Sequence, residues 1–481
     1  MSHTRSRSSV SSAISGPEKL EELTNLMRTL NTDLAQKNLP QNQKTATLER
    51  IKVLGRSVDN AEPIFSKEGI QTLCRHGLDG NTLSTSREAL RCLANALFLK
   101  ADTRQMFVDL GYAPKAVDRL KNENRDDEFL ICRILFLTTY ETDLNFDVLI
   151  DQHHLADHIN AMMARYAKQY SKSSRKINYT AQDDMALSEC LKLIFNITHY
   201  YPDQAVVFSK SIPHILKILF RRRIPEPPLA APISYLINAL INLDLEDRSH
   251  THLAVNPLFP KFEPKCNAEH LINILDKAVA RYRESELDQN AGPIIALIRK
   301  VFELAPDSVK RYMQWLLLPS DEERSRPLGR SDTLSSRLLR LSTSPAAPTL
   351  RESVSSLFFE LSGKDATNFV QNVGYGFASG FLMTHNMPVP DNALEAWSTR
   401  GSDGPDGSGS SQSEPVNPIT GQRLSAEPSH DPGPPMTEDE KEREAEKLFV
   451  LFERLKKTGV VNVQNPVEAA VQEGRIQELK D

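Results

Sequence analysis

The chain has 481 residues, more than one hydrophobic core normally serves, so several domains or an extended repeat architecture are expected. Its formal net charge of −5 creates no general attraction for nucleic acid or for an anionic membrane, and we expect neither as a partner. The five cysteines form no CxxC pair, and no apolar run reaches the ~18 residues of a membrane-spanning helix. These features predict a cytoplasmic protein without disulfides and without an integral membrane segment.

The first two thirds of the chain have the pattern of a helical protein. Residues 1–17 are rich in Ser and Arg and lack an apolar run, which is typical of a disordered tail. From Pro17 to Leu318 the apolar residues recur at the spacing of amphipathic helices, with few alternating runs. Proline-rich breaks such as residues 225–232 separate these helices. The sequence therefore predicts an all-α fold.

A short motif recurs along this helical region. Three segments share the form Leu/Ile-x-x-Leu/Ile-x-Asn and end at Asn95, Asn196 and Asn242, and a fourth ends at Phe136. The offsets of 41 residues (from 95 to 136) and 46 residues (from 196 to 242) match the period of armadillo and HEAT repeats, roughly 40–47 residues. The intervening offset is 60 residues, and the polar stretch 167–184 explains the excess as an inserted loop.

We therefore predict an armadillo/HEAT-type right-handed α-solenoid over residues 18–395, with a generic helical bundle as the alternative. Within it, residues 319–348 are polar and predicted to be irregular, and one further helix is expected over 350–361. Residues 396–435 consist mainly of Gly, Ser, Pro and Asp, and so cannot bury enough apolar surface to fold alone. We expect them to form a disordered linker.

Residues 436–458 have the pattern of an amphipathic helix that the linker separates from the solenoid. Thr437 and Glu440 form a capping-box sequence at its start. The predicted apolar face consists of Ala445, Leu448, Phe449, Phe452 and Leu455. Such a helix must dock either on the solenoid or on a partner. Residues 459–481 form a tail without an assigned role.

The motif asparagines suggest a binding surface, because the leucines of each repeat face the core and the asparagines therefore face elsewhere. Neighbours at i−4 and i−7 extend each asparagine into a stripe, and stacked repeats would align the stripes into one groove. The candidate groove residues are Glu88, Arg91, Asn95, Arg133, Glu189, Lys192, Asn196, Tyr235, Asn238 and Asn242. The alternative is that each asparagine only hydrogen-bonds the neighbouring repeat.

Other motifs favour structural roles. Gly374–Gly380 has the spacing GxGxxxG, which differs from phosphate-binding loops and indicates a tight turn before a helix. Asp151, His154 and His158 could share a helix face, but no further zinc ligand accompanies them. Arg221–Arg223 is typical of a helix end. Without a catalytic constellation, we expect neither an enzyme nor a metal or cofactor.

Four segments in the same order and at similar spacing resemble the synembryn family, over roughly residues 20 to 457. They are Ser86–Leu97, Gly374–Gly380, Asn417–Gly421 and Met436–Glu442. Synembryns are exchange factors and chaperones of heterotrimeric G-protein α subunits. The resemblance implies an armadillo/HEAT superhelix whose concave face receives the C-terminal helix of the α subunit. It also implies that the factor binds the nucleotide-free or GDP-bound subunit and displaces GDP without catalytic side chains.

On the same basis the C-terminal helix would contact the α subunit, through Thr437, Leu448, Phe449 and Phe452. Relatives carry acidic phosphorylation sites before the Asn-Pro-x-Thr-Gly motif, but here that stretch is rich in Gly and Ser. The basic segment around Ser331 and Ser335 offers a separate phosphorylation site. The resemblance further implies a monomer, recruited to the inner face of the plasma membrane through the α subunit, and the divergent tail suggests a fungal member. The remaining alternative is an armadillo-type adaptor or scaffold that binds a helix or peptide without exchange activity.

Overall fold

The computed structural model describes residues 16–80, 82–170, 180–246, 256–388, 416–417 and 419–427, together with Thr437, Arg443, Lys447 and Val450. The chain divides into two compact units, residues 1–423 and 424–481, and helices α1 to α22 lie in the first. The described residues contain no strand, and one isolated bridge pairs Val416 with Arg423. None of the described helices combines the length and apolar character needed to cross a membrane.

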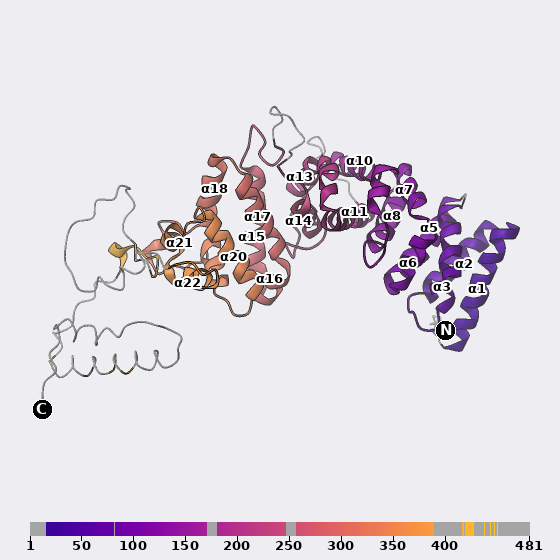
Figure 1. Cartoon of the computed structure of the whole chain (residues 1–481), viewed down its shortest axis with the longest axis horizontal. Helices are drawn as coiled ribbons and strands as arrows, with labels where there is room; N and C mark the ends of the chain where they lie inside the picture. The colour runs from indigo at the N-terminus through magenta and orange to yellow at the C-terminus, as the bar shows by residue number, and fades with distance from the viewer. Residues whose placement is uncertain are drawn as a thin grey trace, which may run out of the picture. The chain divides into compact units, whose positions relative to one another are not determined.

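One continuous row of helices runs through the first unit, and each member packs against the next (Figure 1). This first row consists of α2 (Gln41–Leu54), α5 (Leu83–Leu99), α8 (Arg125–Leu137), α11 (Ala181–Tyr200), α14 (Ile233–Asn242), α17 (Gly292–Leu304) and α20 (Pro348–Leu361). The repeated motif falls in α5, α8, α11 and α14, and its residues Leu90 and Leu93 in α5 are fully buried. The predicted all-helical solenoid is confirmed, whereas the repeat type and the handedness stay predictions.

A second row covers one side of the first. It consists of α1 (Pro17–Gln36), α4 (Lys67–Leu78), α7 (Ala113–Arg119), α10 (Leu155–Lys168), α13 (Ile212–Arg221), α15 (Cys266–Arg281), α18 (Asp307–Leu317) and α19 (Leu334–Leu341). Most of these helices pack on the first-row helix of the same repeat, as α4 does on α5 and α10 on α11. Fully buried residues such as Ile159, Ile215 and Ile274 fill the layer between the rows. Apolar burial of this kind stabilises a solenoid repeat by repeat.

Short helices connect the rows and close the end of the solenoid. They are α3 (Glu62–Phe65), α6 (Asp102–Asp109), α9 (Phe146–Asp151), α12 (Ala205–Phe208), α16 (Glu284–Asn290), α21 (Ala366–Val373) and α22 (Tyr375–Thr384). Turns of 3₁₀ helix are η1 (Leu120–Asn122), η2 (Pro202–Gln204), η3 (Ser209–Ser211), η4 (Glu323–Ser325) and η5 (Leu424–Ala426). Both α19 and η4 lie within the range 319–348, which we predicted to be irregular.

The loop expected over 167–184 is shorter than its polar composition suggests, because α10 continues to Lys168 and α11 already begins at Ala181. A capping box starts α11: the Thr180 hydroxyl accepts a hydrogen bond from the Asp183 amide (3.2 Å), and the Asp183 carboxylate accepts one from the Thr180 amide (2.8 Å). Residues 171–179 lie outside the described part of the chain.

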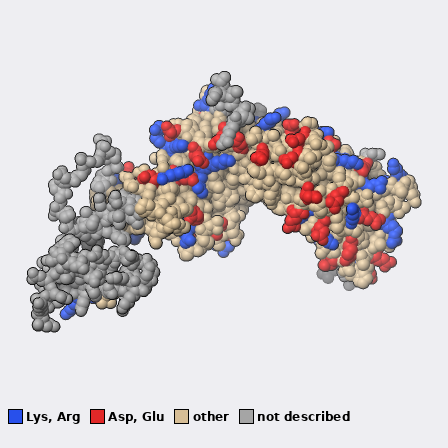
Figure 2. Space-filling model, in the orientation of Figure 1, with Lys and Arg blue, Asp and Glu red and all other residues tan. Residues whose placement is uncertain are grey.

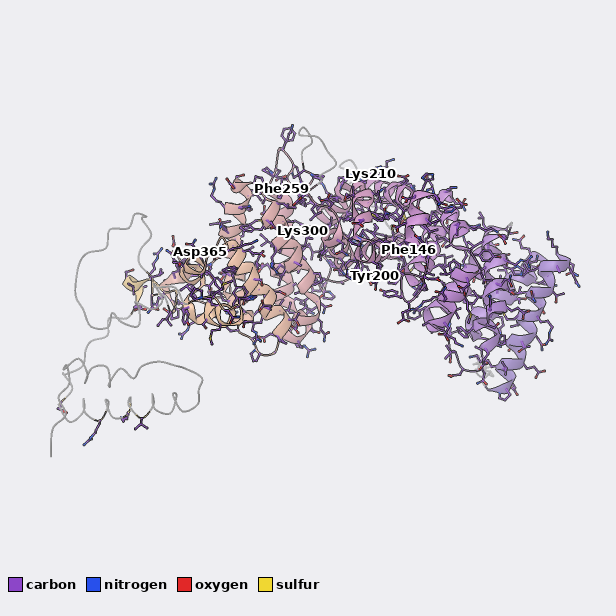
Figure 3. All side chains as sticks on the ribbon, viewed as in Figure 1. Phe146, Tyr200, Lys210, Phe259, Lys300 and Asp365 are labelled. Atoms are coloured by element: carbon purple, nitrogen blue, oxygen red, sulfur yellow. The ribbon has the colours of Figure 1, made fainter. Side chains whose placement is uncertain are left out.

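Buried charges tie neighbouring repeats together. Glu128 on α8 is fully buried and accepts hydrogen bonds from Arg125 (2.7 Å), from Arg165 on α10 (2.7 Å) and from the Tyr166 hydroxyl (2.9 Å). Further along, Lys300 of α17 lies beside α14 (Figure 3) and donates to two carbonyl oxygens at the end of that helix. Since helix ends leave carbonyls unpaired, this lysine stabilises the contact between two consecutive repeats. Burial lowers the pKa of Lys300.

Two of the sequence motifs meet at the end of the solenoid. Gly374 has φ 82°, and α22 starts directly after it, so the predicted turn and helix are confirmed. The amide of Gly376 then donates to the carbonyl oxygen of Ile419, in the Asn417–Gly421 motif (3.1 Å). Residues 416–417 and 419–423, which we call the docked segment, therefore differ from the expectation that all of 396–435 is an unstructured linker. Backbone hydrogen bonds, which composition does not reveal, hold them in place.

Little of the predicted C-terminal helix falls within the described residues. Arg443, Lys447 and Val450 are helical and exposed, and Thr437 is exposed just ahead of them. These three helical positions lie on a face different from the predicted apolar stripe. Leu448, Phe449 and Phe452, which carry that stripe, lie outside the described residues.

Candidate partner-binding groove

The face of the first row that the second row leaves open contains three adjoining pockets. The largest of the three spans α8, α11 and α14 and has a volume of about 320 Å³. The central pocket spans α5, α8 and α11 and has a volume of about 300 Å³. The smallest spans α2, α5 and α8 and has a volume of about 250 Å³. Arg133 lines all three pockets. We call the surface formed by these three pockets the groove.

Aromatic rings and cations alternate along the groove. The guanidinium of Arg133 lies 5.5 Å from the ring centre of Phe98 and 5.9 Å from that of Phe129. The ammonium of Lys192 lies 4.6 Å from the ring centre of Phe136. Cation–π contacts hold these long side chains against the rings and leave Phe98 58% exposed. The groove thus offers apolar area and positive charge together.

Positive charge exceeds negative charge in the central pocket. Glu189 is buried, and its carboxylate contacts both Arg133 (3.2 Å) and Lys192 (2.7 Å). Arg104, from α6, adds a third cation to the same pocket. One carboxylate shared by two cations leaves an excess of positive charge, which favours a partner with a carboxylate or with the negative end of a helix dipole. The face in Figure 2 shows Lys and Arg side chains lying among Asp and Glu.

Six of the ten predicted groove residues line the pockets. They are Arg91, Asn95, Arg133, Glu189, Lys192 and Tyr235. Glu88 lies at the base of the same face: it is buried and contacts Lys52 (2.5 Å) and Arg91. Its role in the structure is to hold two groove cations in place.

The other asparagines make structural contacts. Asn196 is buried and donates from Nδ2 to the Thr139 hydroxyl (2.7 Å), and Asn242 donates to the carbonyl oxygen of Phe195 (3.2 Å). Both bonds join consecutive repeats, which is the alternative that the sequence left open. Asn238 differs, because its buried Oδ1 has no hydrogen-bond partner among the described residues. A buried amide oxygen without a partner is costly, and Asn238 lines none of the three pockets.

Among the groove residues that sequence reasoning missed are Phe98, Phe129, Tyr140 and Arg104. Phe98 follows Asn95 by three positions and Phe129 precedes Arg133 by four, so the helical spacing of the predicted stripes already pointed to both. Tyr140 follows the end of α8. Arg104 belongs to another helix, and no periodicity within one helix could have found it.

The proposed phosphorylation sites surround one carboxylate. The Oε1 atom of Glu323 accepts hydrogen bonds from the hydroxyls of Ser331 (3.1 Å), Ser335 (2.6 Å), Ser336 (2.9 Å) and Thr333. Ser335 is buried, so a kinase could not reach it without local opening, whereas Ser331 is partly exposed. Phosphorylation of Ser331 stays a prediction.

This cluster makes stability sensitive to acid. Burial alone would raise the pKa of Glu323, but hydrogen bonds, chiefly from Ser335 and Thr333, outweigh it and lower the pKa to about 2. A carboxyl group with a lowered pKa stabilises the fold above its unfolded pKa of about 4.3, and this contribution disappears as pH falls toward 2. We expect the urea midpoint of the wild type to fall more steeply between pH 4.5 and pH 2 than that of Glu323→Gln. Parallel pH profiles of the two proteins would contradict this expectation.

One further candidate from the sequence has structural partners. Arg222 of the arginine triplet is buried and donates to both carboxylate oxygens of Asp184 and to the Tyr170 hydroxyl (2.8 Å). Among the described residues, no group of three or more His, Cys, Asp or Glu is arranged to hold a metal ion.

Comparisons with known proteins agree on one family. Residues 47–475 match the family described as Ric8, guanine nucleotide exchange factor synembryn. A synembryn-like chaperone of Schizosaccharomyces pombe is 25% identical, over 76% of this chain and 68% of its own length. The chaperone Ric-8A of Xenopus tropicalis is 24% identical, over 96% of this chain and 88% of its own length. The chaperone Ric-8A of Gallus gallus is also 24% identical, over 92% of this chain and 87% of its own length. The chain thus belongs to the Ric8 family of guanine nucleotide exchange factors, the synembryns.

Proposed function

We propose that this protein binds G-protein α subunits, lowers their affinity for GDP and assists their folding. The observation that carries the proposal is the groove, with the exposed ring of Phe98 and an excess of positive charge. Such a surface suits the C-terminal helix of the α subunit, because an amphipathic helix presents an apolar face and its C-terminal end carries negative charge. Membership of an exchange-factor family and the chaperone names of its relatives support the same assignment.

The mechanism rests on linkage between two binding equilibria. If the groove holds the helix in the arrangement found in the nucleotide-free subunit, this protein lowers the affinity of the subunit for GDP. GDP then lowers the affinity of the subunit for this protein by the same factor. GDP then leaves faster without a catalytic side chain. The same preference for an open, incompletely ordered subunit would protect it while it folds. We further propose a monomer that works in the cytoplasm and reaches the inner face of the plasma membrane through its partner.

The deciding measurement is GDP release from purified α subunits of the same organism. We expect the release rate to rise with the concentration of this protein and to saturate, and a GTP analogue to dissolve the complex. A stable complex with an unchanged rate of GDP release would instead indicate an armadillo-type adaptor without exchange activity. If the protein formed a complex with none of the α subunits, the proposal would be refuted.

A further inference from the structure

Positive charge gathers on the outer side of the second row. Lys217 and Arg221 are exposed on α13, and together with Lys210 and His214 they follow the spacing i, i+4, i+7 and i+11 of a single helix face. The side chain of Lys210 is 74% exposed and lies at the upper edge of the view in Figure 3. Burial lowers the pKa of His214, and the nearby charges of Lys217 and Lys168 lower it further. Since Lys168 ends α10, cations of two helices share this surface.

The surface continues onto α15. The Nε2 atom of His270 lies 3.0 Å from the carbonyl oxygen of Leu219, and its ring centre lies 5.3 Å from that of Phe220, so His270 contacts the end of α13. Lys277 is exposed one face-repeat further along α15, and its charge adds to burial in lowering the pKa of His270. We call the exposed cations of this surface the basic face: Lys168, Lys217, Arg221 and Lys277.

The basic face keeps its charge, because the acids that accompany it already have partners. Glu226 pairs with Arg281 (2.6 Å), and Asp276 of α15 pairs with Arg337. Within the described part of the chain, no member of the basic face forms an ion pair with a carboxylate. Our expectation that an anionic membrane is not a partner rested on the net charge of −5, which hides this local excess.

Exposed aromatic rings extend the same side of the second row toward α18. Trp315 is 71% exposed and stacks on Tyr312, with ring centres 5.8 Å apart. The ammonium of Lys265, at the start of α15, lies 4.5 Å from the ring centre of Tyr312, and Phe262, three residues earlier, is fully exposed. Glu269 also contacts Tyr312, so its charge offsets that of Lys265. This end of the surface therefore offers apolar area and not charge.

We propose that the basic face and these exposed aromatic residues bind the surface of an anionic lipid bilayer directly, without the α subunit. Lys and Arg are attracted to anionic headgroups, and aromatic side chains are favoured at the boundary between headgroups and acyl chains. No residue of the basic face lines a pocket of the groove, so a protein held at the bilayer in this way keeps the groove open. The inference goes beyond the proposed function, in which the partner alone brings the protein to the membrane.

The first test is sedimentation of the full-length protein with vesicles, in the absence of the α subunit. We expect binding to phosphatidylcholine vesicles that contain roughly one third phosphatidylserine, no binding to pure phosphatidylcholine, and weaker binding at higher salt. Each cation near an anionic surface strengthens binding about fivefold, so Lys217→Ala combined with Arg221→Ala should weaken it about 25-fold. Lys115→Ala combined with Lys121→Ala is the matched control, because it changes the net charge equally but removes lysines of α7 and η1 that are already paired with aspartates. The control should bind almost as the wild type does.

The fluorescence of Trp315 reports on the aromatic part of the surface. The chain contains two tryptophans, so Trp397→Phe leaves Trp315 as the only one. We expect its emission to shift to shorter wavelength with the anionic vesicles, and brominated lipids to quench it.

Three results would overturn the inference. They are an unchanged Trp315 spectrum in vesicle-bound protein, equal losses of binding in the two double variants, and failure of the wild type to bind anionic vesicles. If vesicles failed and a DNA duplex bound the wild type but not the variant at Lys217 and Arg221, the basic face would be a site for another polyanion. GDP release from the α subunit in solution tests the proposed function separately.

Discussion

Replacing Glu128 by Gln should destabilise the protein by about 3 kcal/mol or more, because it removes the negative charge that two arginines share inside the solenoid. Glu128 is fully buried and contacts Arg125, Arg165 and the Tyr166 hydroxyl. Glutamine keeps the shape but offers one acceptor oxygen and no charge to these donors. We expect a lower urea midpoint, and since repeats unfold with their neighbours, α8, α10 and α11 should lose exchange protection first.

Glu123 provides a matched control, because it contacts the same Arg165 (3.0 Å) while its side chain is 63% exposed. Exposed ion pairs contribute between about 0 and 1 kcal/mol, so Glu123→Gln should leave the urea midpoint almost unchanged. Equal effects of the two substitutions would mean that burial does not decide the strength of the Glu128 contacts. A small effect of Glu128→Gln would mean that the arginines find other partners.

Replacing Phe98 by Ala should weaken binding of nucleotide-free α subunit about 30-fold or more, while thermal unfolding stays nearly unchanged. The ring is already exposed in the free protein, so its removal leaves no cavity and costs little stability. In a complex, an aromatic side chain at the centre of an interface commonly contributes about 2 kcal/mol or more. Calorimetric titration of the variant with the α subunit measures the change, and GDP release should slow in parallel at limiting concentrations.

Phe262→Ala is the matched control, because Phe262 is fully exposed but lines none of the three groove pockets. It should bind as the wild type does. Arg133→Ala serves as a second groove variant: Glu189 keeps Lys192 as its partner, so folding is largely preserved. If Phe98→Ala and Arg133→Ala both bound normally, the partner would use another surface.

The architecture and part of the groove were predictable from the sequence. Helical periodicity and a recurring motif located the first-row helices, and the stripes around Arg91, Arg133 and Lys192 placed side chains that do line the pockets. Periodicity works here because each repeat buries its own apolar face against its neighbours, so the pattern is local. The same reasoning treated every motif asparagine alike, although Asn196 and Asn242 bond the next repeat and Asn95 lines a pocket.

What depended on contacts between distant segments emerged only from the tertiary structure. Arg104 enters the groove from a separate helix, and the hydroxyls around Glu323 are brought together by a turn. The glycine-rich turn at Gly374 and the Asn417–Gly421 motif are about forty residues apart, and each looked like a local feature. The sequence by itself determined the family, the helical class and the repeat pattern, because these follow from local spacing and composition. The pairing of the two motifs and the excess positive charge of the groove were decided by packing, since each requires groups that local periodicity does not connect.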